Sequence, residues 1–159
     1  KHRRRQRQMC IRDSIYIDSE KMKTHKDSDK TVKVIAGKFN STEGPVNKHN
    51  VHPLYFDVVL NKDKIFDFNL PETHNSFIYL INGEIKVGEK KHEKITDSKL
   101  VLLTKGSKLI VESLIKSNFL LISGKPIGEK IARGGPFVMN TKAEILEAIN
   151  DYHNGTFVK

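Results

Sequence analysis

The sequence predicts an all-β domain, a sandwich or barrel of the jelly-roll type, with one C-terminal α-helix. Across residues 31–124, short runs rich in β-branched and aromatic residues alternate with turn residues, and no helical pattern interrupts them. Many short strands at this spacing are typical of two-layered antiparallel folds. At 159 residues the chain is long enough to bury a substantial core in a single domain.

The expected strands show two kinds of pattern. Residues 31–39 are rich in β-branched side chains, whereas residues 54–60 alternate, with Phe56 and Val58 on one face and Asp57 on the other. The remaining strands are expected at residues 65–68, 76–81, 84–87, 100–103, 109–111 and 119–122.

Turn residues between the runs predict hairpins. Asn82 and Gly83 lie between two apolar runs, and a type I′ turn needs positive φ at both central residues, which Asn and Gly adopt most readily. Lys105 and Gly106 predict a second turn on weaker grounds, since only the glycine is a turn residue.

Three of the runs are apolar at consecutive positions, which predicts that both faces of those strands are covered. These runs are residues 77–81, 100–103 and 119–122. A free-standing antiparallel sheet normally leaves one face in water, so this sheet needs another layer outside it. We expect the C-terminal helix to cover part of that face. Because a helix of about 12 residues is only ~18 Å long, we expect a second domain to cover the rest.

The helix is expected at residues 142–153, where Thr141 and Glu144 fit a capping box. Its apolar side chains recur at helical spacing. They are Ile145, Leu146, Ala148, Ile149 and Tyr152. The pattern favours packing of this stripe against the barrel over a role as a partner-binding helix. Phe137 and Met139 are expected to be buried anchors that tie the tail to the barrel.

The net charge of +9 is concentrated at the N-terminus, so it does not indicate that the barrel binds nucleic acid. Residues 1–13 hold six basic residues against one acidic residue, and only one arginine, Arg133, follows them. Residues 9–14, at the end of this segment and one residue beyond it, resemble a translated sequencing-adapter element. We therefore interpret residues 1–13 as a non-native or disordered basic segment. The alternative is a nucleic-acid-binding arm or a localisation signal, whereas no apolar stretch follows to suggest a secretory signal.

The composition also indicates in which cellular compartment the protein is expected. No apolar run approaches the ~18 residues that a membrane span requires, so no membrane association is expected. Cys10 is the only cysteine, which excludes an internal disulfide and a multi-cysteine zinc site. This favours a reducing compartment, and we expect the protein to be cytoplasmic.

Four segments together resemble the C-terminal half of a pirin, over roughly residues 15–157. They are residues 34–40, 44–46, 74–79 and 135–141. The last of these, directly before the expected helix, is the most specific. The resemblance implies a cupin jelly-roll (double-stranded β-helix) barrel within a parent protein that has two such barrels. In that family the N-terminal barrel holds iron, and the roles include quercetin 2,3-dioxygenase activity and nuclear transcriptional co-regulation.

The pattern and the resemblance together predict the organisation of the chain. The basic segment, residues 1–13, precedes a linker or leading strand at 14–30, the cupin barrel at 31–124, and the C-terminal tail and helix at 125–159. The chain is then expected to be a fragment whose main partner is its own missing N-terminal cupin domain, which would carry the iron. Regulatory protein partners are compatible with this organisation, and no nucleic acid is expected on the barrel itself.

Metal binding within this barrel is not expected, because the ligand positions of the cupin motifs hold unsuitable residues. When the second motif is laid on residues 98–113, Leu109 takes the histidine position, and leucine has no lone pair to donate. When the first motif is aligned on the turn after residue 81, Asn69, Pro71 and Asn75 take its ligand positions. None of these three is a good transition-metal ligand.

Three functional hypotheses remain. The favoured one is a non-catalytic, metal-free cupin domain that completes a two-barrel protein. The alternative is a metal-dependent, quercetin 2,3-dioxygenase-like oxygenase that uses His49, His52 and His74 as ligands. The third is a nucleic-acid binder acting through residues 1–13, whose salt-dependent binding would disappear with that segment. The sequence assigns no catalytic or cofactor-binding residue, since it lacks a nucleophile elbow, a P-loop and a dinucleotide fingerprint.

Overall fold

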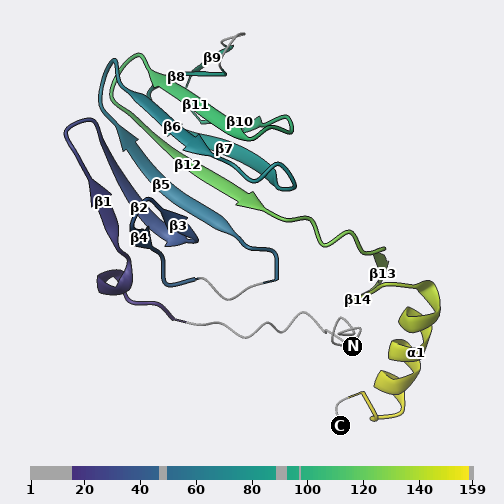
Figure 1. The fold of residues 1–159 in the computed structure, drawn as a ribbon. Helices are drawn as coiled ribbons and strands as arrows, with labels where there is room; N and C mark the ends of the chain where they lie inside the picture. Colours follow the sequence, from purple (N-terminus) through teal and green to yellow (C-terminus); the bar gives the residue numbers. More distant parts are fainter. Residues whose placement is uncertain (1–15, 47–49, 89–92, 97, 158–159) are drawn as a thin grey trace. The chain divides into compact units, whose positions relative to one another are not determined.

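The computed structural model describes residues 16–46, 50–88, 93–96 and 98–157, and these form two compact units that divide between Pro126 and Ile127. The larger unit contains a short 3-10 helix, η1 (Ser19–Lys21), and the strands β1 (Thr24–Lys26), β2 (Lys30–Ala36), β3 (Lys38–Phe39), β4 (Thr42–Glu43), β5 (Leu54–Leu60), β6 (Ile65–Asn69), β7 (Asn75–Asn82), β8 (Glu84–Val87), β9 (Glu93–Thr96), β10 (Lys99–Leu102), β11 (Lys108–Ser113) and β12 (Ser117–Gly124). The smaller unit contains β13 (Ala132–Gly134), β14 (Phe137–Met139) and α1 (Lys142–His153) (Figure 1).

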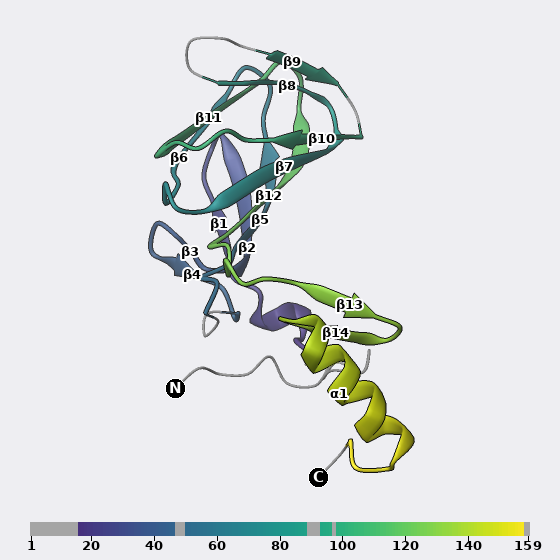
Figure 2. The same ribbon diagram turned by 90° about the vertical axis from the view of Figure 1, so that its right-hand side faces the viewer.

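The larger unit is built from two antiparallel sheets. Their strand orders are β1-β2-β5-β12-β7-β10 and β6-β11-β8-β9, and β3 and β4 form a small separate pair. From β5 onward the described chain changes sheet at every connection except the β8–β9 pair, and Figure 2 shows the two sheets as layers. This alternation is the jelly-roll topology, so the predicted fold class is confirmed.

The core of the larger unit lies between the two sheets. Every second residue is buried from Phe56 to Leu60 in β5 and throughout β12, which is the period-2 pattern of strands with one inward face. The six-stranded sheet contributes Val32, Val34, Phe56, Val58, Leu60, Ile78, Leu80, Phe119 and Leu121, and the four-stranded sheet contributes Phe66, Ile85, Ile95, Leu109 and Val111. Full burial of one such side chain stabilises the fold by about 1.5–3 kcal/mol.

The strand expected at residues 31–39 is divided in the structure at Gly37. This residue has a φ of 79°, a backbone conformation that residues with a Cβ rarely adopt. A Cβ at this position would also lie 2.8 Å from the carbonyl oxygen of Pro53. The chain therefore turns between β2 and β3. The turn carries Phe39 out of the six-stranded sheet and into the core, where it is almost fully buried.

The prediction of a type I′ hairpin at Asn82 and Gly83 is wrong. Gly83 has φ of 103°, but Asn82 keeps negative φ and is the last residue of β7. Strand β7 pairs with β10 and β12, whereas β8 pairs with β9 and β11, so the chain crosses here from one sheet to the other. The turn at Gly106 is likewise a crossing, from β10 to β11. A glycine between two apolar runs therefore does not determine which strands pair.

The helix α1 has the predicted bounds and the predicted N-terminal cap. Thr141 Oγ1 accepts a hydrogen bond from the Glu144 backbone N–H at 3.2 Å, and Glu144 Oε2 accepts one from the Thr141 N–H at 2.8 Å. Loss of such a cap typically costs about 1 kcal/mol. Among the described residues, no helix is both long and apolar enough to cross a membrane.

The smaller unit has its own apolar cluster. Phe137 and Met139 from β14 pack with Ile145 and Ala148 from α1, so the predicted burial of both anchors is confirmed. In the structure both anchors pack against the helix α1. The buried stripe of α1 is narrower than expected from the sequence, because Leu146 and Tyr152 are exposed.

Candidate functional site

Among the histidines that the structure describes, only His74 is buried, with 7% of its surface exposed. It precedes β7 in a turn, where its backbone N–H donates a hydrogen bond to the Pro71 carbonyl oxygen at 2.9 Å. Its Nδ1 lies 3.0 Å from Ser123 Oγ, and Ser76 Oγ donates to the same oxygen at 2.8 Å. His74 Nδ1 is therefore engaged in a hydrogen bond within the protein.

The surroundings of His74 disfavour its protonated form. Burial is the largest cause that lowers the pKa of His74, and the positive charges of His52, Lys105 and Lys125 lower it further. Lys105 is held in place, since its Nζ donates to the His74 carbonyl oxygen at 2.9 Å and to Asn75 Oδ1 at 2.8 Å. His74 is therefore a neutral imidazole near pH 7.

Acidification is expected to destabilise the larger unit through His74. Its pKa is lowered in the folded state, so below about pH 6.5 the unfolded chain binds more protons and the free energy of unfolding falls as the pH falls. The substitution His74→Gln should flatten this dependence in urea unfolding between pH 5 and 8. His153→Gln, at an exposed position of α1, is the control and should leave it unchanged. An equally steep dependence in the His74 variant would show that other groups cause it.

The three histidines of the alternative metal site are only partly placed by the structure. His49 lies outside the described residues. His52 is exposed and close enough to His74 for its charge to lower the pKa of that residue. Within the described ranges, no group of three or more His, Cys, Asp or Glu side chains is arranged to hold a metal ion. The alternative therefore stays a prediction.

The positions that align with cupin ligands do not fit an iron centre. Leu109 is buried in the apolar core, with 4% of its surface exposed. By contrast, Asn69, Pro71 and Asn75 are all exposed, and the Asn75 side chain accepts a hydrogen bond from Lys105. An iron site of this class needs imidazole and carboxylate donors that converge inside the barrel. These side chains offer neither the donors nor a common direction.

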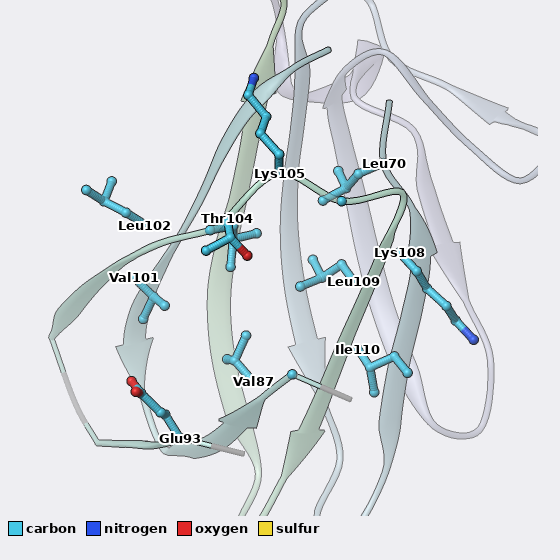
Figure 3. A pocket seen from close by; sticks show the side chains of 13 residues that line it. Leu70, Val87, Glu93, Val101, Leu102, Thr104, Lys105, Lys108, Leu109 and Ile110 are labelled. Atoms are coloured by element: carbon cyan, nitrogen blue, oxygen red, sulfur yellow. The ribbon is translucent and has the colours of Figure 1, made fainter. Parts of the chain in front are cut away.

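A cavity of about 410 Å³ lies beside Leu109 (Figure 3). Its wall is formed by residues of β8, β9, β10 and β11, the turn between β10 and β11, and Leu70 after β6. The sequence predicts that Leu109 cannot serve as a metal ligand, but it does not predict this cavity. No local signal marks it, because its wall residues come from parts of the chain that are distant in sequence, from Leu70 to Ile110.

The outer face of the six-stranded sheet carries the second candidate feature. In β7, Ile78 and Leu80 point into the core, whereas Tyr79 and Ile81 are exposed. In the register of β7 and β10, Leu100 lies opposite Tyr79 and Leu102 lies opposite Phe77, so all five outward side chains form one patch. This outer patch consists of Phe77, Tyr79, Ile81, Leu100 and Leu102. Leu100 and Leu102 are 57% and 76% exposed.

Comparison with known proteins identifies related sequences and structures. The family model of the pirin C-terminal cupin domain matches residues 55–158. The "Pirin-like protein" of Caulobacter vibrioides is 33% identical over 133 residues, and "Pirin" of Homo sapiens is 35% identical over 127 residues. The structure is similar to that of a quercetin 2,3-dioxygenase from Acinetobacter baumannii, with a TM-score of 0.73 and 28% identity over 89% of this chain.

These matches cover most of this chain and about half of each relative. The Caulobacter match covers 83% of this chain and 47% of the relative, and the human match covers 78% and 43%. The Acinetobacter match covers 49% of that protein. The matched family, the identities and the jelly-roll topology agree with one another. The chain belongs to the family of pirin C-terminal cupin domains.

Proposed function

We propose that this chain is a metal-free, non-catalytic cupin domain whose outer patch packs against an N-terminal cupin domain, which would hold the iron of the family. The outer patch is the observation that carries this proposal. Five large apolar side chains on the exposed face of two neighbouring strands are unusual for a free surface, and such patches mark interaction sites.

The occupant of the patch is suggested by the relatives. Each relative compared above is about twice as long as the part that this chain matches, and the matched family is described as a C-terminal domain. Packing between domains of one chain commonly buries roughly 600–1,500 Å². A second cupin barrel offers a sheet face of this extent.

The metal-free role is supported by the chemistry of the interior. Leu109 fills the histidine position with carbon, and Nδ1 of His74 is hydrogen-bonded to Ser123. The alternative, a quercetin 2,3-dioxygenase-like oxygenase within this chain, is suggested by the name of the Acinetobacter protein. It requires three histidine ligands, of which the structure describes His52 and His74.

Metal loading separates the two functions. The purified chain is incubated with Fe(II) without oxygen, passed over a desalting column, and analysed for iron, copper and zinc. We expect less than stoichiometric metal, in equal amounts for the wild type and for His74→Ala, because the barrel lacks a converging donor set. One metal ion per chain that disappears in His74→Ala would contradict the proposal and support the oxygenase.

Charge placed on the outer patch tests the docking surface. We expect the chain to self-associate through the patch, and the double substitution Leu100→Lys, Leu102→Lys to reduce this association in sedimentation velocity. The free energy of unfolding should change by no more than about 1 kcal/mol, because both side chains are already exposed. The control is Ile65→Lys, an exposed position on the other sheet. A wild-type chain that stays monomeric at high concentration would contradict this expectation.

A further inference from the structure

We propose that the cavity between β8, β10 and β11 binds a small, uncharged, mainly apolar molecule. Its volume of about 410 Å³ lies within the range of roughly 300–1,000 Å³ that small-molecule sites occupy. All of its described wall residues belong to the larger unit. The cavity shares one wall residue, Leu102, with the outer patch, and its other wall residues lie outside that patch.

The wall of the cavity determines the character of the ligand. Leu70 and Leu109 are buried at its base, and Val87, Val101 and Leu103 are partly buried around it. These side chains supply only aliphatic carbon. At about 410 Å³ the cavity has room for a two-ring molecule or a medium-length chain.

The charges near the cavity disfavour an anionic ligand. Lys105 donates to the His74 carbonyl oxygen and to Asn75, and Lys108 Nζ lies 3.1 Å from Asp67 Oδ2, so both ammonium groups already have partners outside the cavity. In Figure 3 both lysine side chains point away from the space that Val101 and Leu109 line. A carboxylate bound here would gain little from either lysine.

Two polar side chains refine the ligand class. Glu93 places a carboxylate at the rim, where it would repel a second negative charge. Thr104 is also a wall residue, and its hydroxyl offers one hydrogen-bonding group. An alcohol, a ketone or a phenol matches this arrangement, whereas a fatty acid does not.

Strand β10 allows a sharp test, because neighbouring residues face opposite ways. Val101 points to the cavity and Leu100 belongs to the outer patch. The probe is N-phenyl-1-naphthylamine, which is uncharged at pH 7 and fluoresces in apolar surroundings. We expect saturable binding of one probe per chain. Val101→Phe, which fills the cavity, should weaken binding at least about tenfold, whereas Leu100→Lys should change it less than about twofold.

Competition tests the ligand class, and a second filling variant guards against misfolding. 1-Decanol should displace the probe at much lower concentration than decanoate does. Val87→Phe fills the cavity from β8 and should reproduce the loss, with cooperative unfolding of each variant as the check of the fold. The proposal is overturned if the wild type shows no saturable binding. It is also overturned if Leu100→Lys abolishes binding while the filling variants keep it, or if decanoate competes as well as decanol.

Discussion

Replacement of Phe39 by alanine is expected to destabilise the larger unit by about 3–5 kcal/mol, the range for removal of a buried phenylalanine. Phe39 lies at the centre of an aromatic cluster, with ring centroids 5.7 Å from those of Phe56, Phe66 and Phe68. The cavity left by the ring would open between the two sheets. Urea unfolding followed by circular dichroism measures the loss.

Two control substitutions separate this cavity effect from a general sensitivity of the fold. Phe39→Leu keeps most of the apolar volume and should cost about 1–2 kcal/mol. Leu102→Ala removes a side chain that is already exposed and should change stability by less than about 0.5 kcal/mol. A loss below about 1 kcal/mol in Phe39→Ala would show that the core collapses around the missing ring and that no cavity remains between the sheets.

The role of Phe39 illustrates what sequence patterns predict and what they do not. The β-branched run before it predicted extended chain, and the structure has strands there. The ring contacts Phe56 in one sheet and Phe66 and Phe68 in the other. That position depends on which strands lie in which sheet. A period-2 pattern indicates which face of a strand is apolar, but it carries no information about the partner of that face.

Local signals predicted the elements whose cause is itself local. The capping box of Thr141 and Glu144 joins residues three apart, so its effect could be predicted from the sequence alone, and α1 begins and ends as expected. The alternation in β5 is local in the same sense. The turn at Gly83 was misinterpreted because a tight hairpin and a crossing between sheets can both place a glycine between two apolar runs. Only the pairing of distant strands distinguishes them.

The candidate sites also contain features that one residue determines and features that depend on the pairing of distant strands. The carbon side chain at Leu109 could be recognised from the sequence, because a missing donor atom is a property of one residue. The bond between His74 and Ser123 joins residues 49 apart, and it forms because Ser76 and Ser123 are cross-strand neighbours in β7 and β12. The outer patch was anticipated as an apolar face that needs a cover. Its composition depends on the register of β7 and β10, which places Leu100 opposite Tyr79.

The substitution Gly83→Ala is expected to cost about 3 kcal/mol or more, because two separate effects add. At φ of 103°, an alanine side chain is strained by roughly 1–3 kcal/mol. A Cβ would also lie 2.7 Å from the Cα of Ser117, a backbone atom of β12 that cannot move away alone. Ser117 is fixed further, since its Oγ accepts a hydrogen bond from the Glu84 N–H at 3.1 Å and donates to the Ile115 carbonyl oxygen at 2.8 Å.

The other crossing glycine provides the matched control for Gly83→Ala. Gly106 also lies where the chain passes from one sheet to the other, yet its φ is not positive, and a Cβ there would have no heavy atom within 4 Å. Gly106→Ala should therefore leave the free energy of unfolding within about 0.5 kcal/mol of the wild type. Thermal and urea unfolding of the two variants, measured side by side, decide the point. Equal losses would mean that sheet crossing itself requires glycine, whereas a loss confined to Gly83→Ala identifies contact with β12 and positive φ as the cause.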